Sequence, residues 1–470
     1  MLMFKKLFLK FFIISSFVSS VYFSCSAPSP KNKKDNTDNA ENKINKESTN
    51  TANDVSANLS CEIDGPSSYY TSYNTDHYIP YIWSKNNLED TPYFFTLKPQ
   101  NDLFDKIGFG GKDELNIGFS SPLIAGNKED FYLLGGVNYL DNNMTNIFYN
   151  GLVKVSKSSH HEVIYTNSVD FNGVEGKEEI KKRSNGCLNY FEFITKEGET
   201  EPYLFGFGGK NDLNYSLSDG FVIDMTKKQH LFFGKEFYDN TGTSVVSDWP
   251  SERSSHLCSI KQDINKSRAD LYVAGGENEN KNYSDLWNIK IEKDGNLKIS
   301  SRLVLKDQER IKSCTALNDS YFVIYGGISL KTNQKLKDGI IVRLYDDKIS
   351  YFKIKDTNEN LIGCTSSEFS GLTDNIAISN DGDLLLNIGE NKLSYIKSIV
   401  IDDMFNGSYS QTNQYIAISD IFEGPILNEC IGRKIVPFKK ELLNKTTVGF
   451  LSFGRDDGKY LIFKKEYMKE

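Results

Sequence analysis

A short apolar run that ends in glycine recurs six times along this chain and limits the folds that the chain can adopt. The six runs occupy residues 131–136, 203–209, 271–276, 321–327, 384–390 and 449–455. Their last glycines lie 73, 67, 51, 62 and 65 residues apart. A run of β-branched or aromatic residues closed by glycine is typical of a buried strand that leads into a tight turn. We therefore predict a β-sheet unit that repeats about every 64 residues.

Each of the first four copies carries further strand-like segments at similar offsets. A second apolar segment follows the glycines at 146–155, 218–225, 284–293 and 338–346, and a third follows at 161–167, 230–237, 296–304 and 348–355. A strand of small residues precedes the glycine run. Four strands per unit with no helical period between them are typical of a β-propeller blade. The predicted fold class is therefore all-β, built from four-stranded antiparallel sheets.

One copy resembles a known repeat family. The run WPSERSSH at 249–256, followed by LYVAGG at 271–276 and SDLW at 284–287, resembles a kelch repeat. The resemblance covers residues 116–470 and implies a kelch-type propeller, which we expect to have six blades. Propellers are commonly closed by a strand from the other terminus, and residues 93–98 or 106–110 are candidates for that N-terminal strand. A seventh blade built from residues 67–116 is the alternative.

The N-terminus has the pattern of an export signal. Lys5, Lys6 and Lys10 precede an apolar stretch at 11–24 that is too short to span a bilayer. Because this stretch ends at Cys25, it resembles a bacterial lipoprotein signal, which implies lipidation of Cys25. Bulky residues at 22 and 23 depart from that family's pattern, and cleavage near residue 26 or an uncleaved anchor are the alternatives. We predict a signal peptide at 1–24, a polar tether at 25–60 and one propeller domain at 61–470.

Composition and charge exclude several classes of protein. The 31 Phe and 26 Tyr exclude a wholly disordered chain, and no apolar run suits a polytopic membrane protein. With 63 acidic against 55 basic residues, the formal net charge is −8, which gives no reason to expect nucleic acid as a partner. We expect an exported monomer, anchored by lipid in the cell envelope with its domain in the periplasm or on the surface.

The cysteines and histidines do not have the spacing of a metal site. In register, four cysteines fall on the innermost strand of a blade, where small residues are needed, and we expect them to be buried free thiols: Cys187, Cys258, Cys314 and Cys364. Cys61 and Cys430 are a candidate disulfide across the closure of the ring. The five histidines show no HExxH pattern and no CxxC is present, so we predict no metal and no cofactor. His256 matches a structural histidine of the repeat.

Three arginines recur four or five residues before an innermost-strand cysteine: Arg183, Arg253 and Arg310. Around a central funnel they would bind a carboxylate bidentately. In that arrangement Glu252 is the candidate acid–base residue. The alternative is structural, with each arginine bonded to loop carbonyls or to a neighbouring acidic residue.

Two functions follow from these patterns. The first is a binding module of the cell envelope for a protein or glycan ligand, because propellers carry variable loops on a rigid scaffold. The second is a sugar epimerase that resembles the sialic-acid mutarotases among periplasmic kelch proteins, with acid–base chemistry in the axial pocket. Convergence of the three arginines with one carboxylate favours the enzyme, and separate contacts within single blades argue against it.

Overall fold

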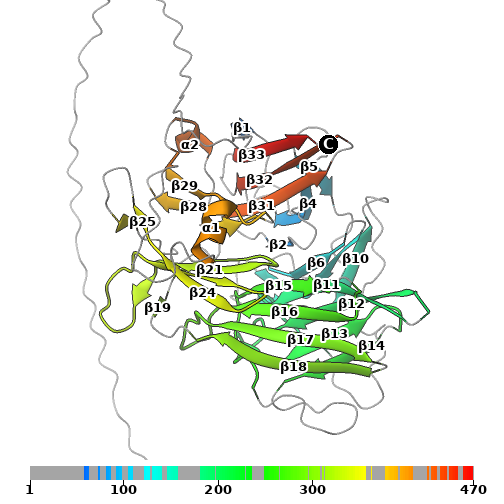
Figure 1. Cartoon of the computed structure of the whole chain (residues 1–470). Helices are drawn as coiled ribbons and strands as arrows, with labels where there is room; N and C mark the ends of the chain where they lie inside the picture. Colours follow the sequence, from blue (N-terminus) through cyan, green and yellow to red (C-terminus); the bar gives the residue numbers. More distant parts are fainter. Residues whose placement is uncertain are drawn as a thin grey trace, which may run out of the picture. The chain divides into compact units, whose positions relative to one another are not determined.

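The computed structural model (Figure 1) describes the following residues: 58–62, 72–74, 81–85, 92–97, 104–108, 121–127, 130–139, 146–156, 180–195, 197–227, 229–234, 248–263, 265–294, 296–306, 310–311, 313–355, 361–362, 376–379, 381–389, 392–405, 421–422, 425–430, 434–441, 444–453 and 459–468. The predicted signal peptide and Cys25 lie outside these residues, and so does Cys364. The last three residues of the predicted tether belong to a strand.

The described residues form seven antiparallel sheets of three or four strands, so the fold is all-β. In the first part of the chain these sheets contain β2 to β5 (Ser72–Asn74, Tyr81–Lys85, Pro92–Leu97, Phe104–Gly108), β6, β7 and β10 (Leu123–Gly126, Asp130–Leu134, Leu152–Ser156), and β11 to β14 (Cys187–Ile194, Thr200–Phe207, Gly220–Asp224, Gln229–Phe233).

The second part of the chain supplies four more sheets. They contain β15 to β18 (Leu257–Gln262, Arg268–Ala274, Leu286–Asp294, Asn296–Leu305), β20, β21, β23 and β24 (Cys314–Leu317, Tyr321–Tyr325, Gly339–Arg343, Lys348–Phe352), β27 to β30 (Ile376–Ile378, Leu384–Gly389, Lys392–Ile396, Ile421–Phe422), and β1 with β31 to β33 (Asn58–Glu62, Lys434–Glu441, Lys445–Phe453, Tyr460–Met468). Each sheet is named below by its first and last strand, and the sheet of β1 and β31–β33 is called the terminal sheet.

Shorter elements connect these sheets. Three strand pairs are β8 with β9 (Val137–Tyr139, Asn146–Phe148), β19 with β22 (Arg310–Ile311, Ile328–Ser329), and β25 with β26 (Ile354–Lys355, Leu361–Ile362). The described helices are α1 (Ser398–Phe405) and α2 (Pro425–Cys430). Neither of these two helices has the length and apolar character needed to cross a membrane.

The described residues form seven sheets of three or four strands, one more than the six blades predicted. Residues 72–108 form a four-stranded sheet of their own, in agreement with the alternative of an additional unit from residues 67–116. Six blades were favoured because only 25 residues separate Gly111, in the glycine-rich segment GFGG at 108–111, from Gly136, which is too short for a whole blade. In the structure β5, the fourth strand of its sheet, ends at Gly108, so the distance from this glycine-rich segment to the next glycine pair is not the length of a repeat.

The N-terminal strand that joins the C-terminal strand is not one of the two expected segments. β1 pairs antiparallel with β33, from Asn58 opposite Lys464 to Glu62 opposite Tyr460. The expected segments at 93–98 and 106–110 instead contribute to β4 and β5, which pair with each other. A strand from the start of the described chain thus completes the terminal sheet, although the strand lies about 30 residues upstream of the expected one.

Five pairs of consecutive sheets share hydrophobic cores. Buried residues of the β6–β10 and β11–β14 sheets form one cluster, and those of the β11–β14 and β15–β18 sheets form the next. The same relation joins the β15–β18 and β20–β24 sheets, the β20–β24 and β27–β30 sheets, and the β27–β30 and terminal sheets. Both faces of an inner sheet are therefore apolar, which explains why its central strands read as continuous apolar runs in the sequence rather than alternating ones.

The glycine pairs hold a backbone conformation that other residues rarely adopt. Both glycines of the pair at 275–276 have positive φ, 64° and 90°. A Cβ on Gly276 would lie 2.7 Å from the carbonyl oxygen of Ser254, and a Cβ on Gly209 would lie 2.6 Å from that of Ser184. The second position of the pair therefore needs glycine for two reasons. Its φ is positive, and the backbone that precedes the first strand of the same sheet leaves no room for a Cβ.

Candidate functional site

The three predicted arginines are buried, and each contacts the aspartate that precedes the third strand of the four-stranded sheet that follows it. Arg183 donates to both carboxylate oxygens of Asp219, at 2.7 and 3.3 Å, and neither side chain is more than 5% exposed. Arg253 donates in the same way to Asp285, at 2.6 and 3.0 Å. Such planar, bidentate contacts suit a guanidinium group. They occupy the N–H groups that a ligand carboxylate would otherwise bind.

Arg310 follows the same pattern with looser geometry. Its Nη1 lies 3.6 Å from a carboxylate oxygen of Asp338 and donates to the carbonyl oxygens of Gly326 and Asp338. In each of the three sheets the aspartate precedes the third strand, and the arginine also donates to the carbonyl oxygen of the first glycine of the pair. The three arginines therefore do not converge on one point. Their contacts match the structural alternative stated above.

The backbone of the same arginine segment links two sheets. The carbonyl oxygen of Arg253 accepts from the amide of Gly209 in the preceding sheet, and that of Arg183 accepts from the amide of Gly136. Because their side chains bond within the sheet that follows while their backbones bond to the sheet before, Arg183 and Arg253 each fix the junction of two repeats. The buried guanidinium groups are thus neutralised by aspartates within the protein, and their segments link neighbouring sheets.

Glu252 does not lie in a closed pocket with these arginines. Its side chain is exposed, and its carboxylate accepts from the side-chain amide of Asn278 at 3.2 Å. Arg253, the next residue, directs its side chain to Asp285 instead. None of the three arginines therefore serves as an anion-binding group beside the candidate acid–base residue.

The expectation of buried free thiols is wrong for three of the four innermost-strand cysteines. Cys187 and Cys258 form a disulfide between β11 and β15, the first strands of consecutive sheets, and Cys314 is also disulfide-bonded. Cys61 of β1 and Cys430 of α2 form the disulfide that the sequence analysis named as a candidate.

A one-residue offset explains how Cys187 and Cys258 meet. Phe207 and Ala274 are equivalent, because each directly precedes the glycine pair of its sheet. Phe207 lies opposite Cys187, whereas Ala274 lies opposite Leu257, the residue before Cys258. Because side chains of a strand alternate between two faces, this offset turns the two cysteines in opposite directions. One faces the following sheet and the other faces the preceding sheet. The offset was visible in the sequence as four residues from Arg183 to Cys187 but five from Arg253 to Cys258.

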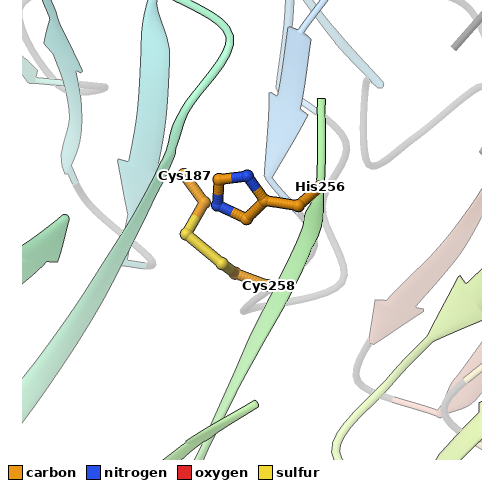
Figure 2. A group of neighbouring side chains, drawn as sticks. All are labelled: Cys187, His256 and Cys258. Atoms are coloured by element: carbon orange, nitrogen blue, oxygen red, sulfur yellow. A yellow bond between two sulfur atoms is a disulfide. The ribbon is translucent and has the colours of Figure 1, made fainter. Parts of the chain in front are cut away.

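His256 lies directly against this disulfide, as Figure 2 shows. Its side chain is 8% exposed, and the potential donor atoms of His256, Cys187 and Cys258 all lie within 4.8 Å of one another. Neither ring nitrogen has a hydrogen-bond partner among the described residues. Burial, and then the positive charge of Arg253, lowers the pKa of His256 to about 3, so the imidazole is neutral at pH 7. In the sequence, only the alternation His256–Leu257–Cys258 could have indicated that these two side chains share a face.

The loops between the second and third strands present apolar side chains to solvent. In the β11–β14 sheet this loop carries Leu213 and Tyr215, which are 70% and 59% exposed. The Asn211 side chain accepts from the backbone amides of both residues, which holds the loop in one conformation. In the β20–β24 sheet the equivalent loop carries Leu330, 57% exposed, beside turns held by the Ser329 hydroxyl.

The equivalent loop of the β15–β18 sheet is polar and contacts its neighbour. Glu279 accepts from the backbone amide of Ser216, and Glu277 lies 3.9 Å from the ammonium group of Lys210. Asn278 accepts from the amide of Asn280 and fixes this loop internally. Two consecutive sheets thus join their loops at the same edge.

Comparison with known proteins adds no relative. No protein-family model matches the chain, and no curated protein matches it. A functional interpretation therefore depends on the contacts of this chain's own residues.

Proposed function

We propose that this chain is an exported, lipid-anchored kelch-type β-propeller that binds a protein ligand at the bacterial cell envelope. The observation that carries this proposal is the set of loops between second and third strands. These loops are fixed by side-chain-to-backbone hydrogen bonds, yet they expose Leu213, Tyr215 and Leu330 at their tips. Large apolar side chains on pre-ordered polar loops are typical of protein-binding surfaces, because ordering the loop in advance lowers the entropic cost of binding.

The propeller part of the proposal is supported by the repeating order of the sheets. Consecutive sheets share cores, the arginine segments join one sheet to the next, and β1 completes the terminal sheet. A propeller built on this pattern has seven blades. The kelch resemblance places the arginine, the glycine pair and the aspartate of three blades in the same register, where they form the contacts described above.

Export is supported by the disulfides. Among the described residues, five elements carry disulfide-bonded cysteines, namely β1, β11, β15, β20 and α2, and disulfides persist in oxidising compartments outside the cytosol. Lipid attachment to Cys25 is tested by metabolic labelling with a palmitate analogue. Label incorporation that is lost in Cys25→Ser supports the anchor, and equal incorporation in both proteins contradicts it.

The epimerase alternative has no support from the described residues. It requires the arginines to converge with a carboxylate, whereas Arg183, Arg253 and Arg310 each contact an aspartate of the four-stranded sheet that follows. Glu252 is exposed and bonded to Asn278. We therefore retain the binding module alone.

Site-specific photo-crosslinking in the producing cell tests the binding function. A photoreactive residue replaces Tyr215 or Leu330, and Tyr351 serves as the control because it is equally exposed, at 66%, but lies on the outer strand β24. We expect one defined protein adduct from the two loop positions and none from the control. Binding on a glycan array that is lost in Tyr215→Ser, without a protein adduct, would show a glycan ligand instead. Adducts of equal yield at all three positions would contradict a specific site.

A further inference from the structure

The pair of unpartnered nitrogens on His256 is the starting point of this inference. The imidazole lies in the interior, 5.3 Å from the ring of Phe207 in an edge-on contact, and both nitrogens lack a hydrogen-bond partner among the described residues. Burying a polar group without a partner costs free energy, and such exceptions in native proteins usually have a function. Both sulfur atoms of the disulfide and one nitrogen of this ring lie within 4.8 Å of one another, and the backbone of Phe207 also lies close to the ring.

The three side chains have the chemistry of a zinc site in which two ligands are at present bonded to each other. Two thiolates and a neutral imidazole are ligands that Zn²⁺ prefers, with Zn–S bonds of about 2.3 Å and Zn–N bonds of about 2.0–2.1 Å. Tetrahedral ligands at those bond lengths lie about 3.5–3.8 Å apart. The donor atoms of Cys187, Cys258 and His256 already lie within 4.8 Å of one another. Separation of the two sulfur atoms is the one large change that the site needs.

We propose that Cys187, Cys258 and His256 form a redox-gated zinc site, closed as a disulfide when oxidised and able to bind Zn²⁺ when reduced. A dithiol reductant supplies two electrons and two protons. The bond between the cysteine sulfurs breaks, two thiols form, and the reductant becomes a cyclic disulfide. Zn²⁺ then displaces the two thiol protons to solvent and binds both sulfurs and one ring nitrogen of His256, which leaves a fourth position for water.

Charge favours zinc over monovalent copper in this position. Two thiolates with Zn²⁺ are neutral overall, whereas two thiolates with Cu⁺ leave one net negative charge in the interior. An uncompensated buried charge is strongly unfavourable. The nearest buried cation, Arg253, already pairs with Asp285 and does not balance that extra charge.

The scaffold holds the ligands in place while leaving an entry path. Cys187 and Cys258 lie at the starts of β11 and β15, in two sheets that share a core, and a Cβ on Gly208 would lie 2.9 Å from Cε1 of His256. The ring is therefore enclosed on one side by backbone. Cys258 is only partly buried, and we expect a reductant and a metal ion to approach the disulfide from its side.

The test uses the full chain, with zinc chloride alone as the probe. A phosphine reductant takes up one oxygen atom from water as it converts each disulfide to two thiols, and unlike a dithiol it does not compete for zinc. Zinc bound at equilibrium is measured by competition with a chromophoric chelator. The proteins compared are wild type, the double variant Cys187→Ser with Cys258→Ser, His256→Phe, and His230→Phe as a buried-histidine control from β14.

We expect reduced wild type to bind one equivalent of Zn²⁺ more than the reduced double variant, and oxidised wild type to lack that equivalent. His256→Phe should weaken this equivalent at least tenfold, because one of its three protein ligands is lost, and His230→Phe should not. Equal stoichiometry in wild type and the double variant would overturn the proposal. So would equal affinity in wild type and His256→Phe.

A second measurement needs no variant and so does not depend on how the variants fold. Reduced wild type is alkylated with and without Zn²⁺, and the modified cysteines are identified by peptide mass spectrometry. Protection of both Cys187 and Cys258 supports the site. Alkylation of these two cysteines at the same rate with and without the metal would contradict it.

Discussion

Replacement of Asp219 tests whether the repeated arginines hold the sheets together or remain free for a ligand. Asp219 is 5% exposed and accepts two hydrogen bonds from Arg183, whose side chain is fully buried. Asp219→Asn keeps the shape of the side chain but removes the negative charge. The guanidinium group then lies buried with only neutral acceptors, which include the carbonyl oxygens of Gly208 and Lys181.

The expected loss in the free energy of unfolding is about 3–5 kcal/mol, the usual cost of leaving one partner of a buried ion pair uncompensated. The matched control is Asp347→Asn, which breaks an ion pair with Arg302. The Arg302 side chain is 55% exposed and that of Asp347 is 33% exposed. Solvent-exposed pairs contribute at most about 1 kcal/mol. Asp347 has a φ of 56°, which asparagine tolerates, so the control adds no backbone strain.

Urea unfolding at pH 7 without reductant measures both changes, with fluorescence of the buried Trp249 as one signal. A third protein, Arg183→Met with Asp219→Leu, should regain most of the loss, because an apolar pair of similar volume replaces a buried ion pair at little cost. If Asp219→Asn lowers the free energy of unfolding by no more than Asp347→Asn does, the result contradicts the buried Arg183–Asp219 ion pair that the structure shows. The anion-binding hypothesis for Arg183 would then need to be reconsidered.

Three further predictions address the turns, the ionisation of a buried tyrosine and the terminal disulfide. Gly276→Ala should lower the free energy of unfolding by about 3 kcal/mol, whereas Gly198→Ala, also with positive φ but with nothing within 4 Å of its added Cβ, should lose only about 1 kcal/mol in the same urea experiment. Burial raises the pKa of Tyr272 to about 12, so the folded state retains a proton that the unfolded chain loses near pH 10. The free energy of unfolding should therefore fall as the pH rises from about 10 to 12. Thermal unfolding of Tyr272→Phe should show a less steep fall. Cys430→Ala opens a disulfide between residues 369 positions apart and should cost about 2–5 kcal/mol under non-reducing conditions, a difference that disappears when both proteins are reduced.

Much of the architecture could be predicted from the sequence because it depends on local patterns. Glycine pairs after apolar runs indicated the second strand of each unit, and in the structure the pair at 275–276 ends β16 and turns into β17 with positive φ. The all-β class and the four-stranded sheets followed from the spacing of such runs. The number of sheets did not follow, since the glycine-rich segment 108–111 has the same letters as a repeat turn but begins at the last residue of a fourth strand, β5.

The function of individual residues was harder to predict, because it depends on which strands become neighbours. The recurrence of Arg183, Arg253 and Arg310 was visible in the sequence, and both a ligand clamp and a structural role were compatible with it. Only the folded chain shows each guanidinium group bonded to an aspartate 28 to 36 residues later. Charge and spacing in a sequence do not reveal whether a side chain is already neutralised in the interior.

The sequence by itself determined the repeating β-sheet units and the positions of their glycine turns, because strand periodicity and left-handed glycines are properties of short segments. It also contained the offset that turns Cys187 and Cys258 to opposite faces. Only the tertiary structure decided that those faces meet, that the two sulfur atoms are bonded, and that the unpartnered imidazole of His256 lies against them. Contacts between residues about 70 positions apart depend on how one sheet packs on the next, and that packing results from whole faces of apolar side chains rather than from any single motif.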